Sequence, residues 1–195
     1  FSGGRTYYCH PSLKYDDKYW LEKVTRDDLL KAYKNRWSYI NGLYIDNVSI
    51  ENNKDAIIFS EKLSVRAPNY VSKVGNDFLF APNVFNQSQD IPPRIIDRKQ
   101  DLFISEGFTE IDKCDVLLPS NCSVDSLPKD ITVDSKFGSY SISFKQIAEN
   151  KLEYNRNLII RKGSYPAEDY NAYRSFRKKI AKLDKSKVLL KLKTN

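Results

Sequence analysis

Three cysteines and a single histidine are the side chains whose chemistry can be tested first. A cysteine nucleophile needs a histidine that takes its proton and a third group that orients the histidine. The histidine, His10, directly follows Cys9. Because successive side chains of an extended segment point to opposite faces, this pair cannot readily form the required hydrogen bond, and Cys114 and Cys122 have no other imidazole. We therefore expect no catalytic residue in this chain.

The same four side chains equal the number of ligands that a structural zinc ion takes. Their spacing contains no CxxC or HxxxH pair, so we expect no metal ion and no cofactor. A disulfide between Cys114 and Cys122 is a stronger candidate, because a hairpin loop centred near Leu118 would place them opposite each other across two strands. The alternative is two reduced, packed cysteines, with the Leu118-Pro119 pair bending one continuous strand.

The carboxylates are numerous but scattered. One group of four aspartates lacks the regular spacing of a calcium loop: Asp112, Asp115, Asp125 and Asp130. Two acidic pairs lie where helices are expected to begin and there complement the helix dipole: Asp27-Asp28 and Glu168-Asp169. The sequence contains no glycine-rich phosphate loop, no GxSxG and no HExxH. The carboxylates therefore predict helix capping rather than catalysis.

Aromatic residues make up 13% of the chain, and 13 of them are tyrosines. In a β protein, tyrosine usually fills half-buried strand faces. Aromatic side chains that line an exposed groove can instead stack against a sugar or a peptide. The densest local cluster offers Tyr15, Tyr19 and Trp20 as candidate stacking residues.

The clearest structural pattern lies in residues 137–192. Apolar residues alternate with polar ones over 139–144 and again over 152–160, which predicts two antiparallel strands joined by a turn at Asn150. Gly163 ends the second strand, and Pro166 fixes the first turn of a helix. Apolar residues then recur every three or four positions as far as Leu183, and a last strand follows over 188–192.

The preceding residues predict one helix followed by many strands. Thr25 and Asp28 resemble a capping box, and Asn41-Gly42 is a typical helix end. Beyond Gly42 a period of two predicts eight to ten strands in all, with a long irregular crossover over 82–98. We expect a mainly β (α+β) fold: an antiparallel β-sandwich with two amphipathic helices packed against it, in a single domain over 1–195 with a helical insertion at about 16–40.

The composition is that of a globular chain. It has 195 residues, 41% of them hydrophobic, and a net charge of +7 from 32 basic and 25 acidic residues of interspersed sign. The basic residues are concentrated at the end of the second predicted helix, where they interact favourably with the helix dipole. Because this interaction accounts for their position, we do not expect nucleic acid or a membrane as a partner. The first residues lack the features of a signal peptide, and we expect a processed product or a fragment of a longer chain.

Three motifs carry a resemblance to a known family: FGxY from Phe137, GxYPxEDYxAYRxF from Gly163, and KVLLK from Lys187. They resemble the C-terminal β-rich domain of Gram-negative envelope transglutaminase-like proteins, strongly over 98–195 and more weakly from residue 25. Such proteins also carry an N-terminal β domain and a central transglutaminase-like domain. The resemblance implies an exported chain in the periplasm or outer cell envelope, with the catalytic Cys, His and Asp on a neighbouring domain.

The expected function is therefore that of a non-catalytic β-sandwich accessory or interaction domain, whose partner is a transglutaminase-like domain or another envelope protein. A second hypothesis is a carbohydrate- or peptide-binding module built on the aromatic cluster. A third is a membrane-associating β protein, suggested by amphipathic strands and the basic helix.

Overall fold

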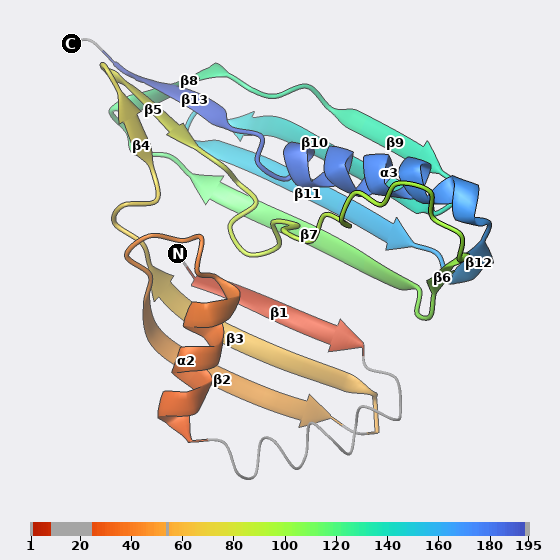
Figure 1. Ribbon diagram of the computed structural model, residues 1–195. Helices are drawn as coiled ribbons and strands as arrows, with labels where there is room; N and C mark the ends of the chain where they lie inside the picture. Colours follow the sequence, from red (N-terminus) through yellow and green to blue (C-terminus); the bar gives the residue numbers. More distant parts are fainter. Residues whose placement is uncertain (1, 9–24, 54, 194–195) are drawn as a thin grey trace. The chain divides into compact units, whose positions relative to one another are not determined.

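The computed structural model describes residues 2–8, 25–53 and 55–193 (Figure 1). The chain divides into two compact units, Phe1–Val71 and Ser72–Asn195, and each is described by itself. The expectation of a single domain over 1–195 stays a prediction.

Among its described residues, the first unit contains a small sheet and one helix. Its strands β1 (Ser2–Tyr8), β2 (Tyr44–Asn53) and β3 (Ile58–Arg66) are antiparallel in the order β1-β3-β2. Helix α2 (Arg26–Arg36) packs on this sheet, where the Tyr33 hydroxyl donates to Glu61 Oε1 of β3 at 2.5 Å.

The predicted start of this helix is confirmed, whereas its end is corrected. The hydroxyl of Thr25 accepts from the backbone N–H of Asp28 at 3.2 Å, which forms the cap. The helix ends at Arg36, and turns lead to Gly42 with φ +67. Of the helical insertion predicted at about 16–40, residues 16–24 lie outside the described residues.

The second unit contains a four-stranded antiparallel sheet, here called the main sheet, in the order β7-β11-β10-β9. Its strands are β7 (Phe108–Leu117), β9 (Ile131–Ser135), β10 (Gly138–Ala148) and β11 (Lys151–Ile160). A second sheet has the order β4-β5-β13-β8, from β4 (Ser72–Val74), β5 (Asp77–Phe80), β8 (Cys122–Ser126) and β13 (Val188–Leu192). The short strands β6 (Leu102–Ile104) and β12 (Gly163–Tyr165) pair with each other.

The predicted hairpin forms the centre of the main sheet. Strands β10 and β11 pair from Gly138 opposite Ile160 to Phe144 opposite Tyr154, with the turn at residues 149 and 150. The tight entry to β10 requires glycine, because Gly138 has φ +151 and a Cβ atom there would lie 1.8 Å from the carbonyl oxygen of Ile159. The alternation of apolar and polar residues in β10 and β11 determines which of their side chains face the core.

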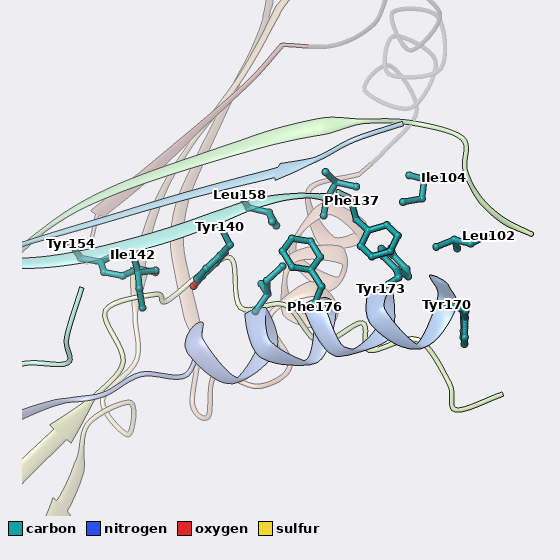
Figure 2. Packing of buried hydrophobic residues seen from close by; sticks show 12 residues of the cluster. Leu102, Ile104, Phe137, Tyr140, Ile142, Tyr154, Leu158, Tyr170, Tyr173 and Phe176 are labelled. Atoms are coloured by element: carbon teal, nitrogen blue, oxygen red, sulfur yellow. The ribbon is translucent and has the colours of Figure 1, made fainter. Parts of the chain in front are cut away.

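Helix α3 (Tyr170–Leu183) covers one face of the main sheet, here called the inner face (Figures 1 and 2). A 3₁₀ turn (Ala167–Asp169) begins directly after Pro166, as the sequence predicts. Figure 2 shows the helix side chains Tyr173 and Phe176 directed at Phe137, in the turn before β10, and at Tyr140 of β10. The rings of Phe137 and Tyr173 meet edge to face at 5.3 Å, so aromatic packing joins the two layers.

The prediction of a mainly β (α+β) fold is confirmed, and its layers are now defined. The core lies between α3 and the main sheet, and the second sheet continues on the same side (Figures 1 and 2). Residues 82–98 contain no helix or strand, as predicted. A hairpin between 114 and 122 does not form, because β7 pairs with β11 whereas β8 pairs with β13.

Candidate functional site

A buried arginine is the first polar feature of the main sheet. Arg156 occupies an inward position of β11, and its side chain is 1% exposed. Its Nε donates to Asp184 Oδ1 at 2.7 Å, directly after α3, and its Nη1 donates to Glu110 Oε2 at 2.9 Å and Asp112 Oδ2 at 2.7 Å, both on β7. One guanidinium therefore ties the helix end to two strands.

The carboxylate of Asp184, which is fully buried, is equally well satisfied. Its Oδ1 also accepts from the Tyr140 hydroxyl at 2.7 Å, and its Oδ2 accepts from the backbone N–H of Ser88 at 2.8 Å. Asn86 donates in turn to Asp112. Buried charges need such complete pairing, since an unpaired one is costly.

The electrostatics fix the protonation states of this ion-pair network. Burial and the Asp184 carboxylate raise the pKa of Tyr140 far above its ordinary value of 10.0. Burial opposes the charge of Arg156, but the carboxylates of Asp184, Asp112 and Glu110 together more than offset it, so the pKa of Arg156 is raised above its ordinary value. Tyr140 is thus protonated and Arg156 charged throughout the physiological pH range. These two protons therefore stay on Tyr140 and Arg156 near neutral pH, which suits a structural role.

The opposite side of the main sheet, here called the outer face, carries small polar side chains. Ser141 lies opposite Asn157 of β11 and Thr132 of β9, and Ser143 lies opposite Asn155. A pocket of about 350 Å³ opens on this part of the sheet. Its lining comprises Ile111, Asp112, Asp130, Ile131, Thr132, Ser141, Ile142, Ser143, Asn155, Arg156 and Asn157.

Three charged groups around the pocket have polar partners within the second unit. Lys113 lies 3.3 Å from Glu153 Oε2, and Asn155 Nδ2 donates to Glu153 Oε1 at 3.0 Å. These contacts, the hydrogen bond from Asn155 first and Lys113 second, lower the pKa of Glu153. At the other rim, Asp130 accepts from the backbone N–H of Phe144 at 2.9 Å. The pocket therefore presents mainly hydroxyls and carboxamides to a ligand.

One of these carboxamides has unused hydrogen-bonding capacity. Asn157 Oδ1 is buried and accepts no hydrogen bond from any residue that the structure describes. An amide oxygen has two lone pairs, and half a turn about the last side-chain bond exchanges Oδ1 with Nδ2. Because Asn157 lines the pocket, a bound hydroxyl could become its donor.

The predicted disulfide pair is not brought together. Cys114 lies half-buried on β7 beside Tyr154, whereas Cys122 is buried on β8 of the second sheet, and both are free. Their arrangement in the structure agrees with the alternative to the disulfide, two reduced and packed cysteines. Burial, followed by repulsion from Asp115 and Asp112, raises the pKa of the Cys114 thiol, so this side chain is a poor nucleophile.

The predicted aromatic groove is not tested by the structure. Tyr15, Tyr19 and Trp20 lie outside the described residues. Among residues 2–8, 25–53 and 55–193, no cluster of three His, Cys, Asp or Glu side chains could hold a metal ion. Within the same ranges, no helix is long and apolar enough to cross a membrane.

Sequence reasoning missed both the ion-pair network and the pocket. Arg156 gave a signal, because it stands at an inward position between Tyr154 and Leu158 and so demands a buried partner. The identity of that partner, Asp184, had no signal, since 28 residues separate the two. The serines of β10 alternate with apolar residues in the sequence, but only the register shows which carboxamides lie beside them.

Comparison with known proteins adds one family. The model of a domain of unknown function that has solved structures, DUF3858, matches residues 76–190. The chain belongs to this family. No curated protein and no solved structure matches it. The DUF3858 match covers the main sheet, α3 and the first part of β13, so it includes both the ion-pair network and the pocket.

The three motifs of the sequence lie in the core of the DUF3858 domain. Phe137 and Tyr140 of FGxY are buried, as are Tyr170, Tyr173 and Phe176 of the helix motif and Val188 and Leu190 of KVLLK. The aromatic residues pack between α3 and the main sheet, and Val188 and Leu190 lie on β13, which pairs with β5. They define a fold and assign no chemistry.

Proposed function

We propose that this DUF3858 chain is a non-catalytic accessory or interaction domain of an exported transglutaminase-like protein in the periplasm or outer cell envelope. The observation that carries the non-catalytic part is the saturation of the ion-pair network. Arg156, Asp184 and Tyr140 have the composition of a catalytic cluster, yet all three are buried, and both Arg156 and Tyr140 donate to Asp184. Catalytic groups need a proton that can move and a substrate within reach.

The transglutaminase-like partner is supported by the three motifs alone. They resemble the C-terminal domain of such proteins, and in the structure the first two build the packing of α3 on the main sheet. A chain that shares this core is expected to share the neighbour with which the core occurs. The cellular location follows from the same resemblance.

A two-part experiment tests this proposal. In the first part, the chain is incubated with a glutamine peptide and a fluorescent primary amine, with an active transglutaminase as the positive control. We expect no incorporation of the amine. Incorporation that is lost in Cys114→Ala would show that the chain is itself catalytic and refute the non-catalytic assignment.

In the second part, the complete reading frame is expressed in its own cells and treated with a lysine-reactive crosslinker. We expect crosslinks between the lysines of Ser72–Asn195 and a transglutaminase-like domain, on the same chain or on a partner. A complete reading frame without such a domain, together with no crosslink to a transglutaminase-like protein, would refute the proposed neighbour.

The outer-face pocket favours a second candidate function, a carbohydrate- or peptide-binding module. This pocket is lined by hydroxyls and carboxamides of neighbouring strands, and Asn157 Oδ1 has no donor among the described residues. The aromatic cluster at Tyr15, Tyr19 and Trp20 is a separate part of this candidate. Binding and accessory roles are compatible, because a domain can present a ligand to its neighbour.

A further inference from the structure

We propose that the outer-face pocket of the main sheet is a binding site for a neutral saccharide chain. The inference deepens the proposed interaction function and rests on it. It assigns the site to Ser141, Ser143, Asn155 and Asn157, with Thr132 and Ile111 at the two ends of the row.

The geometry of the four central side chains suits a sugar ring. Ser141 and Asn157 are directly opposite each other, as are Ser143 and Asn155. Neighbouring strands lie about 4.8 Å apart, and alternate residues of one strand about 7 Å apart, so the four side chains mark the corners of a rectangle of roughly 5 by 7 Å. This is the size of one sugar ring with its hydroxyls.

The chemistry of the pocket selects a neutral ligand with many hydroxyls. A carboxamide supplies two donors and an acceptor oxygen, and a serine hydroxyl is both donor and acceptor, which matches the dual character of sugar hydroxyls. The two cations nearest the pocket are paired, Lys113 with Glu153 and Arg156 with Asp112, and Asp130 adds a carboxylate to the lining. An anionic ligand would therefore find no free cation among the residues that line the pocket.

An apolar contact completes the site at one end. Ile111 lies opposite Asn157 on β7, and it is 76% exposed although it is a large hydrophobic side chain. The C–H face of a sugar ring can cover such a side chain while the ring hydroxyls reach the carboxamides. This contact also lowers the exposed apolar area of the sheet.

A peptide fits this surface less well than a saccharide. A peptide strand gains its affinity for a sheet from main-chain hydrogen bonds at an edge. The pocket lies on a face, across β9, β10, β11 and β7, where the ladder bonds run within the sheet plane. A peptide there would contact side chains only, and its own backbone groups would stay without sheet partners.

The first test is an amide-shift titration of the 195-residue chain labelled with nitrogen-15. The probes are cellohexaose, xylohexaose, mannohexaose and maltohexaose, each at about 10 mM, above the millimolar range in which weak sites bind. We expect saturable shifts from at least one of them, concentrated at residues 109–113, 130–132, 141–143 and 155–157. The absence of shifts with all four, or shifts confined to other residues, would overturn the proposal.

Variants then locate the site. Asn155→Ala combined with Asn157→Ala is expected to weaken binding at least about tenfold, because two hydrogen-bonding groups are lost. Ser141→Tyr introduces a side chain that strands favour and that fills the pocket, so it should abolish binding. This variant keeps the test valid if the two alanine substitutions perturb folding. The matched control is Asn171→Ala on the exposed surface of α3, which should bind as the parent chain does. Equal binding by all variants would refute the assignment of these residues.

Two further outcomes separate this inference from the proposed function. Shifts with a neutral Ser- and Thr-rich octapeptide, but with none of the sugars, would overturn the saccharide while leaving an interaction domain. Amine incorporation by the chain, together with saccharide binding at the pocket, would refute the non-catalytic assignment and leave the site standing.

Discussion

The substitution Asp184→Asn removes the charge that holds three buried donors together. The Asp184 carboxylate accepts from Arg156, Tyr140 and the backbone N–H of Ser88 at 2.7 to 2.8 Å. An asparagine of the same shape keeps one acceptor oxygen and places an NH₂ group where the second oxygen was. That NH₂ group then faces a buried donor, whichever way the amide is turned.

The expected loss of stability follows from the surroundings of Arg156. Breaking a buried ion pair by removing one partner costs about 3 to 5 kcal/mol. Arg156 keeps Asp112 at 2.7 Å and Glu110 at 2.9 Å, which limits its exposure as an unpaired charge. We therefore expect the lower end of this range, about 3 kcal/mol, a large part of the total stability of a domain.

The assay has to report on the second unit alone. Both tryptophans, Trp20 and Trp37, precede residue 72, so no tryptophan fluorescence comes from the second unit. Hydrogen exchange of peptides from β10 and β11 in increasing urea gives the free energy of unfolding of the main sheet. In Asp184→Asn this free energy should fall while the tryptophan transition stays at the urea concentration of the parent chain.

The matched control is Asp125→Asn on β8, where Lys191 pairs with Asp125 at 2.7 Å on the surface. Exposed pairs contribute about 0 to 1 kcal/mol, so this variant should unfold nearly as the parent does. A loss below about 1 kcal/mol in Asp184→Asn, equal to that of the control, would refute the structural role of the network.

Three further predictions concern other positions of the second unit. Gly138→Ala should cost at least about 2 kcal/mol by the same exchange assay, because a side chain at φ +151 is strained and meets the carbonyl oxygen of Ile159; an unchanged free energy would contradict the tight entry to β10. Cys114 should react with iodoacetamide more slowly than a cysteine peptide at pH 8, since its pKa is raised, and mass spectrometry without reductant should find it unbonded. The pKa of Glu153 is lowered in the fold, so its contribution to stability is full above its ordinary value of 4.5 and is lost as the pH falls through the lowered value. An NMR titration of the Glu153 carboxyl should give the lowered pKa, and Asn155→Ala should move this pKa upward. An unchanged pKa in the variant would show that Asn155 is not the cause.

Local patterns predicted the central hairpin and the helix that covers it. The alternation over 139–144 and 152–160 identified β10 and β11 because each of these strands buries one face only. Pro166 marked the helix start, since its conformation suits a first turn and not a strand. Each of these signals depends on residues that are close together in the sequence, and such local patterns can be recognised in a single sequence.

Pairing over longer distances was beyond the same reasoning. The sequence leaves a hairpin as one of two interpretations of residues 114–122, with Cys114 on its first strand and Cys122 on its second. In the structure, the first strand joins β11 and the second joins β13, about 70 residues further along the chain. Loop chemistry sets a turn but does not choose the partner strand, so neither the separation of Cys114 and Cys122 nor the meeting of Arg156 with Asp184 could be derived.

The position of β13 has a consequence for the order of events during synthesis. In the second sheet, β13 lies between β5 and β8, although it is the last of the four to leave the ribosome. Strand β5 pairs with it over Val188–Lys191, and β8 pairs with it over Leu189–Leu192. Until residue 192 has been made, both strands have an open edge that can pair with another chain. A nascent chain that stalls before this point would expose two unfinished edges, and holding it unfolded until its last strand is available would protect it from aggregation.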